Sequence, residues 1–317
     1  MLTTVRSAAP AIPTRLLTAL RGSLATTETM LDVESRLVFV CGARPAKNKD
    51  GARDRLIQYA KKHIKGFEFF IAEDVYIARS ASARDGSPAN RIDLLSIERQ
   101  LGEYADCIIM ILETESVFAE LGAFSSEDAL IKKLLVINDR RYKDCHDPSF
   151  ITLGPLAKVA KGSEFPEPII YVDIRHILAA ATTIEATLAT IRLGKAKSVD
   201  LSSGRKFLDA SKKERLLFVR DLVWFFAPLC DWELSGIVSQ LYGEGEVSVR
   251  FQLDLLCALG LAARAQDSDY YFPAGKHGLF FRYKGIKEVE ARAAIINYYH
   301  KNNPERTRAI GARIHGA

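Results

Sequence analysis

The 317-residue sequence lacks the features that mark secreted, membrane-spanning and metal-binding proteins. Its five cysteines are scattered, odd in number and without a CxxC pair, which argues against a disulfide framework and against a zinc site. The six histidines form no pair with the spacing of metal ligands. No apolar run approaches the roughly 18 residues of a membrane span, and no apolar segment with a cleavage site marks a secretory signal. We therefore expect a cytoplasmic protein without a metal site or membrane association.

The common phosphate-binding motifs are also missing. The first apolar strand, residues 37–41, ends at Gly42, and a glycine there lets a ligand come close to the backbone. The loop that follows, ARPAKNKDG, fits neither the GxGxxG fingerprint nor the GxxxxGK[ST] loop. Gly42 is therefore a candidate ligand contact without a standard nucleotide-binding loop.

Composition and charge indicate an ordinary globular protein with a basic end. Hydrophobic residues make up 48% of the chain and charged residues 26%, and the length suggests two domains. The net charge is only +5, but residues 276–317 hold nine Lys and Arg against three Asp and Glu. This excess favours a polyanion as partner of the C-terminal part, and it is equally compatible with a solvated basic tail.

Strand-length apolar runs alternate with helical patterns through residues 36–193. Because such alternation is typical of parallel sheets covered by helices, it predicts an α/β domain with a doubly wound parallel sheet. Residues 1–35 form a predicted N-terminal helical arm. The expected strands cover residues 37–41, 67–72, 107–112, 133–137 and 169–172, and the expected helices cover 53–65, 92–104, 118–129 and 174–192, with a mobile loop over 79–91.

The stretch 105–124, ADCIIMILETESVFAELGAF, is the centre of this domain. Its apolar run is a strand buried on both faces, and residues 113–116 form a polar loop at that strand's carboxyl end, where open α/β sheets bind ligands. Glu120 then lies in the first turn of the next helix, near the positive end of the helix dipole. Glu120 either faces the ligand crevice or only complements that dipole.

The polar residues expected near the crevice are mainly carboxylates. They are Glu73, Asp74, Glu98, Glu113, Glu115 and Glu120. The sequence suggests no Cys–His or Ser–His pairing. One carboxylate beside an anomeric carbon can act as nucleophile or stabilise an oxocarbenium-like transition state, and a second can hold ribose hydroxyls or carry a proton. This combination suits glycosidic cleavage. Glu120 and Glu98 are the catalytic candidates, whereas most of the other acids, taken singly, fit a solvated surface.

The second domain has the pattern of a winged helix. After a polar linker over 194–213, helical patterns at 214–228, 232–242 and 248–259 precede two short strands at 261–264 and 269–272. Arg250 and Gln252 begin the expected recognition helix, which is poor in Lys and Arg. We therefore favour docking of protein or RNA over reading of DNA. Residues 285–311 form a final basic helical segment of this smaller domain, 214–317.

A series of short motifs resembles the nucleoside deoxyribosyltransferase-like superfamily, and within it the effector proteins of type II retrons. The resemblance spans roughly residues 36–160. Its motifs are FVCG at 39–42, AED at 72–74, LSIE at 95–98, the strand opened by Ala105 and Asp106, AELGAF at 119–124, KL at 133–134, ND at 138–139 and FITLGP at 150–155.

The resemblance implies that Glu120 stands for the catalytic glutamate of the ELG motif. Its further implications concern the pocket, in which Gly42, Glu98, Asp106 and Ser116 would contact the nucleotide. To these we add Glu73, Asp74, Ser96 and Glu113 as substrate-binding candidates. One departure is Ser116-Val117, where relatives tend to have Gly-Ser, and it leaves the exact substrate open.

The resemblance also implies a function and partners. Such an effector would cleave an N-glycosidic bond, with NAD as substrate and no cofactor, during abortive antiviral defence. It would be controlled by the retron reverse transcriptase and its msDNA/RNA, in a homo-oligomer or a higher assembly. Two alternatives remain, a winged-helix regulator with a nucleotide-sensing domain and a nucleoside salvage transferase. The basic second domain argues against the transferase, because a salvage enzyme needs no nucleic-acid partner.

Overall fold

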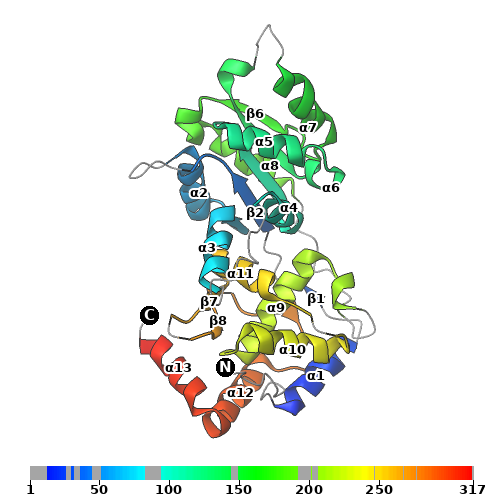
Figure 1. The fold of residues 1–317 in the computed structure, drawn as a ribbon, viewed down its shortest axis with the longest axis vertical. Helices are drawn as coiled ribbons and strands as arrows, with labels where there is room; N and C mark the ends of the chain where they lie inside the picture. Colours follow the sequence, from blue (N-terminus) through cyan, green and yellow to red (C-terminus); the bar gives the residue numbers. More distant parts are fainter. Residues whose placement is uncertain are drawn as a thin grey trace, which may run out of the picture. The chain divides into compact units, whose positions relative to one another are not determined.

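The computed structural model divides the chain into two compact units, which are described separately (Figure 1). The sheet unit comprises Ser35–Ile77 and Ala83–Leu193, and the helical unit comprises Met1–Glu34, Ala78–Ser82 and Gly194–Ala317. The structure describes residues 13–25, 30–31, 36–44, 51–82, 94–143, 149–191, 201, 206–245, 247–266, 268–275 and 277–315.

A five-stranded sheet with the order β3-β2-β4-β5-β6 forms the sheet unit, and all neighbouring strands are parallel. The prediction of a parallel α/β sheet is confirmed. Every residue of the three central strands is buried, as expected for apolar runs covered on both faces. The strands are β2 (Arg36–Cys41), β3 (Phe67–Phe70), β4 (Cys107–Ile111), β5 (Leu134–Asp139) and β6 (Ile169–Val172).

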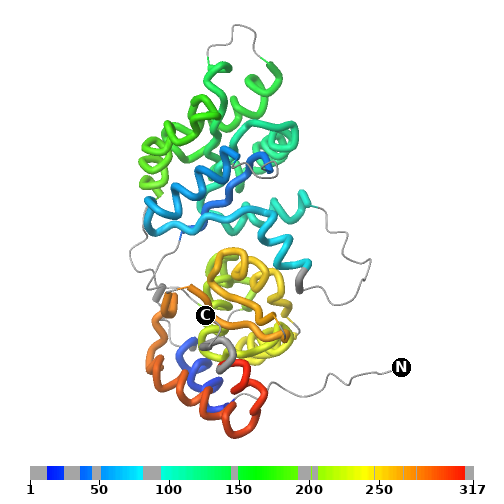
Figure 2. The backbone as a smooth tube through the Cα atoms, turned by 90° about the vertical axis from the view of Figure 1, so that its left-hand side faces the viewer, coloured from blue at the N-terminus to red at the C-terminus, as the bar shows by residue number. Residues whose placement is uncertain are grey.

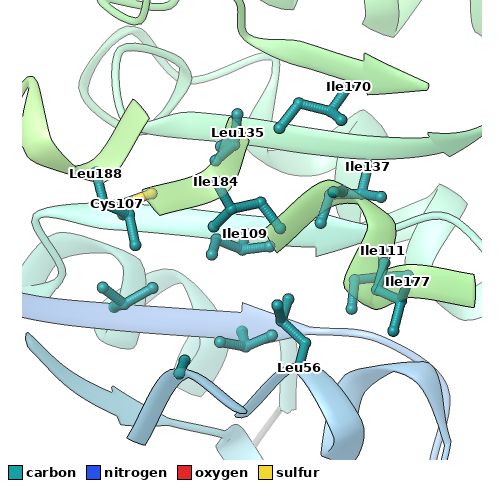
Figure 3. Close-up of a cluster of buried hydrophobic side chains, with 14 of the residues drawn as sticks. Leu56, Cys107, Ile109, Ile111, Leu135, Ile137, Ile170, Ile177, Ile184 and Leu188 are labelled. Atoms are coloured by element: carbon teal, nitrogen blue, oxygen red, sulfur yellow. The ribbon is translucent and has the colours of Figure 1, made fainter. Parts of the chain in front are cut away.

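Helices cover both faces of this sheet. On one face, α2 (Ala52–His63), the 3-10 segment η4 (Ile174–Ala180) and α8 (Ala181–Ala189) pack on the sheet, and Figure 3 shows Ile109 and Ile137 of the strands facing Ile184 of α8. On the other face lie α4 (Leu94–Tyr104) and α5 (Glu115–Phe124), where the ring centroids of Phe39 and Phe124 are 6.5 Å apart. The layers therefore match those of a doubly wound sheet.

Several connections differ from their predicted form. The expected helix over 174–192 is interrupted, because His176, inside η4, has non-helical backbone angles. Residues 79–82 of the predicted mobile loop belong to α3 (Ala72–Ser82), whereas the rest of that loop lies outside the described residues. The remaining connections contain α6 (Asp128–Ile131), η2 (Arg140–Tyr142), η3 (Thr152–Leu156) and α7 (Ala157–Gly162).

The strand order identifies where a ligand should bind. From β2 the chain crosses to β3 on one side, and it then returns to β4 on the other side of β2. Such a reversal opens a crevice at the carboxyl ends of the two strands that flank it, here β2 and β4. The residues after Cys41 and after Ile111 are therefore placed at the entrance of that crevice.

The helical unit is built around α9 (Lys212–Phe226), in which ten residues are buried. Ser211 and Glu214 cap its first turn reciprocally, which fixes where the helix begins. Two antiparallel ladders, β7–β8 and β1–β9, complete the unit. Its other elements are α1 (Thr14–Ala25), β1 (Met30–Leu31), η5 (Phe207–Asp209), α10 (Asp231–Tyr242), α11 (Arg250–Ala258), β7 (Ala262–Arg264), β8 (Tyr271–Pro273), β9 (Phe281–Arg282), α12 (Glu288–Asn302) and α13 (Pro304–His315).

Segments predicted to be peripheral are part of this unit. Phe207, within the predicted linker, is fully buried and packs on Tyr242 with ring centroids 5.4 Å apart. The helix α1 of the predicted arm packs on α10, and Figure 2 traces it in blue beside the C-terminal helices. The predicted C-terminal helix is two helices, separated at Asn303. Among the described helices, none has the length and apolar character needed to cross a membrane.

A buried ion pair joins α13 to α10. Arg306, 6% exposed, donates hydrogen bonds to the Pro228 carbonyl and to the Glu233 carboxylate, and Glu233 is 2% exposed. The guanidinium also lies over the ring of Tyr299, 4.9 Å from its centroid. The last helix is therefore held by an ion pair whose loss would leave a buried charge.

We expect Arg306→Met to lower the free energy of unfolding of the helical unit by about 3–5 kcal/mol, because Glu233 would be left buried without its partner. Urea unfolding followed by tryptophan fluorescence reports this unit, since both tryptophans, Trp224 and Trp232, lie in it. The exposed Arg308→Met is the matched control and should change stability by less than about 0.5 kcal/mol. Equal urea midpoints for the two variants would show that the Arg306–Glu233 ion pair does not stabilise this unit.

Candidate functional site

A cavity of about 520 Å³ opens at the carboxyl end of β2, between that strand and the helices around it, including α5, which follows β4. Its volume lies in the range of small-molecule and cofactor sites. Residues of β2, α2, α3, α4 and α5, all of the sheet unit, contribute to its wall. They are Phe39, Val40, Cys41, Gly42, Arg44, Arg53, Ala72, Glu73, Tyr76, Ile77, Leu94, Ile97, Glu98, Ser116 and Glu120.

Arg53 is one of two arginines in this wall, together with Arg44. Its guanidinium binds both carboxylate oxygens of Glu73, at 2.8 and 3.1 Å, and donates to the Gly42 carbonyl at 3.1 Å. A Cβ atom at Gly42 would lie 3.1 Å from Cβ of Arg53, so the glycine lets the arginine pack closely against the end of β2. Arg53 therefore ties α2, α3 and the loop after β2 into one rigid frame.

Glu98 and Glu120 face the same cavity from α4 and α5. Burial, together with the charges of Glu120 and Glu73, raises the pKa of Glu98 to about 7. Burial also raises the pKa of Glu120, with a smaller contribution from Glu73. Two carboxyl groups with raised pKa values at one site can divide the roles of proton carrier and anionic group, as acid–base catalysis requires.

Cys41 lies beneath these carboxylates at the end of β2. Burial, followed by the charges of Glu120 and Glu98, raises the pKa of its thiol well above the usual range, so the sulfur stays protonated. The thiol donates a hydrogen bond to Glu120, which lowers the pKa of that carboxyl in opposition to burial. Cys41 therefore helps to hold Glu120 in place in the cavity.

One side of the entrance is apolar. Tyr76 and Ile77 of α3 and Leu94 of α4 line the cavity and remain 49%, 62% and 57% exposed. Large apolar side chains left in contact with water at a cavity are typical of a ligand-binding surface. The cavity therefore offers an apolar surface at its entrance and carboxylates in its wall.

The structure brings five of the predicted site residues to this cavity, namely Gly42, Glu73, Glu98, Ser116 and Glu120. Glu113 and Asp74 lie outside its wall. The Glu113 carboxylate accepts a hydrogen bond from the Ala43 backbone at 3.2 Å, which joins the loop after β2 to the end of β4. Asp74 is half-buried in the first turn of α3, and burial raises its pKa.

Ser96 and Asp106 do not reach the cavity. Ser96 is exposed on α4. Asp106 immediately precedes β4, so it lies at the amino end of that strand, opposite the crevice, and its carboxylate accepts a hydrogen bond from the Leu37 backbone at 2.8 Å. Arg53, Cys41 and the apolar entrance were not predicted as parts of the site. The close approach expected at Gly42 was that of a ligand, whereas the structure places the Arg53 side chain there.

Comparison with known proteins assigns the chain to a family. The model of the STM3845 retron effector protein matches residues 49–264, which is more than half of the chain. The chain belongs to the STM3845 retron effector family. This family region includes Arg53, Glu73, Glu98, Ser116 and Glu120, whereas the end of β2 precedes it.

Two relatives of this retron effector come from Escherichia coli. "Retron Ec73 putative ribosyltransferase/DNA-binding protein" is 26% identical over 288 residues, which cover 86% of this chain and 87% of the relative. "Retron Ec86 putative ribosyltransferase/DNA-binding protein" is 35% identical over 124 residues, 39% of this chain and 37% of the relative. Both names combine a ribosyltransferase with DNA binding.

Proposed function

We propose that this retron effector cleaves the N-glycosidic bond of NAD or a related nucleotide in the cavity of the sheet unit. One observation carries the proposal, the presence of Glu98 and Glu120 in a single nucleotide-sized cavity with raised pKa values. Glu120 would act as nucleophile or as stabiliser of the oxocarbenium-like transition state. Glu98 would carry the proton.

In the proposed reaction with NAD, the bond between ribose C1′ and the nicotinamide nitrogen breaks, and its electron pair leaves with nicotinamide. Because the nitrogen is cationic in NAD, nicotinamide leaves neutral and needs no proton. Water adds its hydroxyl to C1′ and gives a proton to Glu98, so the products are nicotinamide, ADP-ribose and a proton. Tyr76, Ile77 and Leu94 would contact the base.

The retron context supports the remaining parts of the proposal. We infer a nucleoside deoxyribosyltransferase-like fold for the sheet unit and a winged helix for α9, α10, α11 and the β7–β8 ladder. The reverse transcriptase and its msDNA/RNA would hold the effector in check until infection by a virus, in a cytoplasmic homo-oligomer or higher assembly. The relatives' names, which join ribosyl chemistry to DNA binding, support this combination.

A DNA-binding regulator is the second candidate, and the relatives' names favour it. The winged helix would then read a duplex through α11, while the sheet unit would only sense a nucleotide. However, Gln252, predicted near the start of the recognition helix, is 6% exposed, and Asp254 on the same helix is 1% exposed. A helix that buries its polar side chains offers few contacts to base edges, so the enzyme remains the preferred function.

The test is a product analysis with a panel of substrates. The purified protein, alone and with its reverse transcriptase–msDNA complex, is incubated with NAD, with purine nucleosides, and with a deoxynucleoside plus a free base. Free nicotinamide without transfer supports the glycosidase, whereas exchange of bases supports the salvage transferase. Sequence-dependent duplex binding without any turnover in the panel would favour the regulator.

The position of Asp106 gives a separate prediction. Asp106→Ala should leave the KM and kcat of the proposed reaction unchanged, because its carboxylate lies at the opposite end of β4 from the cavity. It should lower stability by about 1–3 kcal/mol, since the Leu37 N–H would lose its charged acceptor. Steady-state kinetics and urea unfolding measure the two effects. A raised KM with unchanged stability would instead place Asp106 in the nucleotide pocket.

A further inference from the structure

A second cavity, of about 440 Å³, lies at the same edge of the sheet, at the carboxyl ends of β5 and β6. Among the residues that the structure describes, those of its wall are all charged, and none of them belongs to the wall of the first cavity. The five residues are Asp139, Arg140, Arg141, Asp173 and Arg175. Three cations and two anions leave a positive excess in this cavity.

The cavity contains the same arrangement twice. Asp139 ends β5, and its carboxylate binds Nε and Nη2 of Arg141, each at 3.0 Å. Asp173 follows β6, and its carboxylate binds Nε and Nη2 of Arg175 at 3.0 and 2.8 Å. Because Asp139 pairs with Val172 in the sheet, and Asp173 follows Val172, the two aspartates are near neighbours at the ends of adjacent strands.

Each aspartate also accepts a hydrogen bond from the backbone of its arginine, which fixes the carboxylate. Its Arg175 partner lowers the pKa of Asp173 to about 2, and Arg141 lowers that of Asp139. Both carboxylates therefore stay charged at neutral pH. The carboxylates orient the guanidiniums of Arg141 and Arg175, whose side chains are 76% and 86% exposed. Such exposed pairs contribute little to stability, so stabilisation does not account for them.

The arginines keep donors for a ligand. A guanidinium has five N–H donors, and each aspartate takes Nε–H and one Nη2–H, which leaves three at the outer end. Within the described part of the chain, neither guanidinium donates a hydrogen bond to another side chain, and Arg140 has no ion pair. The Arg141 guanidinium also lies over the Tyr142 ring, 5.8 Å from its centroid. The outward-facing N–H donors of Arg141 and Arg175, beside a third arginine, suit a ligand with several anionic oxygens. A phosphate group meets this requirement better than a single carboxylate does.

We propose that Arg141 and Arg175, held by Asp139 and Asp173, form a phosphate-binding site at the carboxyl ends of β5 and β6. The phosphate belongs either to a polynucleotide or to a free nucleotide, and in the second case the inference rests on the proposed nucleotide chemistry of the sheet unit. Binding rather than turnover is measured, so a failure of the glycosidase proposal leaves this test intact.

The experiment uses the full chain and two probes, a fluorescein-labelled single-stranded DNA of about 20 nucleotides, long enough to span several phosphates, and ADP. Fluorescence anisotropy measures the affinity for the DNA, and calorimetry measures the affinity for ADP. The variant Arg141→Gln/Arg175→Gln should bind at least one probe about tenfold or more weakly, because two charge-assisted contacts are lost. Weaker binding of the DNA by this variant identifies a polynucleotide as the source of the phosphate. Weaker binding of ADP alone identifies a free nucleotide.

Two further variants separate geometry from charge. Arg141→Lys/Arg175→Lys keeps both charges but has no fork, so it should recover only part of the lost affinity. Arg99→Gln removes an equivalent charge from α4 in the same unit, where Arg99 is 53% exposed beside Glu127, and it should bind as the wild type does. Wild-type affinity of the double Gln variant for both probes, or an equal loss in Arg99→Gln, would overturn the proposal.

Discussion

Replacing Glu120 with Gln is expected to lower the rate of N-glycosidic cleavage by at least about 10³-fold, the largest effect of any single change. Gln has nearly the same shape, but it can neither attack C1′ nor stabilise positive charge there. The cavity around it should persist, because Arg53 and Glu73 hold α2 and α3 independently of Glu120. Chromatographic measurement of nicotinamide, beside a circular dichroism spectrum, checks activity and folding together.

Glu115→Gln is the matched control for this variant. Glu115 lies on the same helix, α5, but it is exposed and outside the cavity wall. Its replacement should leave the rate within about twofold of the wild type, as expected for a surface change without a structural role. If Glu120→Gln kept the wild-type rate, Glu120 would lose its proposed role and the carboxylate mechanism would fail.

Glu98→Gln is expected to have the second largest effect, a fall in kcat of about 10²–10⁴-fold, which is typical for loss of a general acid or base. The pKa of Glu98, about 7, also makes a prediction for the wild type. With NAD, Glu98 must be ionised to accept a proton from water, so the rate should rise as pH increases through about 7. Glu98→Gln should remove this dependence.

The direction of the pH dependence identifies the substrate class. A purine base leaves a nucleoside without positive charge and needs a proton, so with purine nucleosides protonated Glu98 would be the active form. The rate would then fall as pH increases through about 7. Measuring kcat of wild type and Glu98→Gln against pH for both substrates tests the assignment. If kcat of the Glu98→Gln variant still changed with pH near 7, Glu98 would be excluded as the origin of that change.

The sheet and the location of Glu98 and Glu120 at one cavity could be predicted from the sequence because local patterns determine them, whereas their catalytic roles stay predictions. Continuous apolar runs such as 107–112 produce strands buried on both faces, and chain order places a helix, α5, after the carboxyl end of β4. Glu120 lies in the second turn of α5 and not in the first as predicted, because the helix already begins at Glu115. Glu98 reaches the same cavity from α4. The motif series gave the retron family, which the family model confirms over residues 49–264.

Other features depend on contacts that one sequence does not encode locally. The Arg53–Glu73 pair joins residues of α2 and α3, and nothing in either segment specifies the partner. Asp106 adjoins the central strand, but it lies at the amino end, which a motif match does not distinguish from the carboxyl end. Phe207 looked like linker because its neighbours are polar, yet Tyr242 and Phe218 bury it.

The most direct test of the central claim is a time course of the purified protein with NAD, followed by NMR, with and without the reverse transcriptase–msDNA complex. We predict that nicotinamide and ADP-ribose accumulate in equal amounts in at least one of these states. The opposite result is NAD that stays intact in both states although calorimetry shows that it binds. That outcome would make the cavity a nucleotide sensor and would contradict the glycosidase.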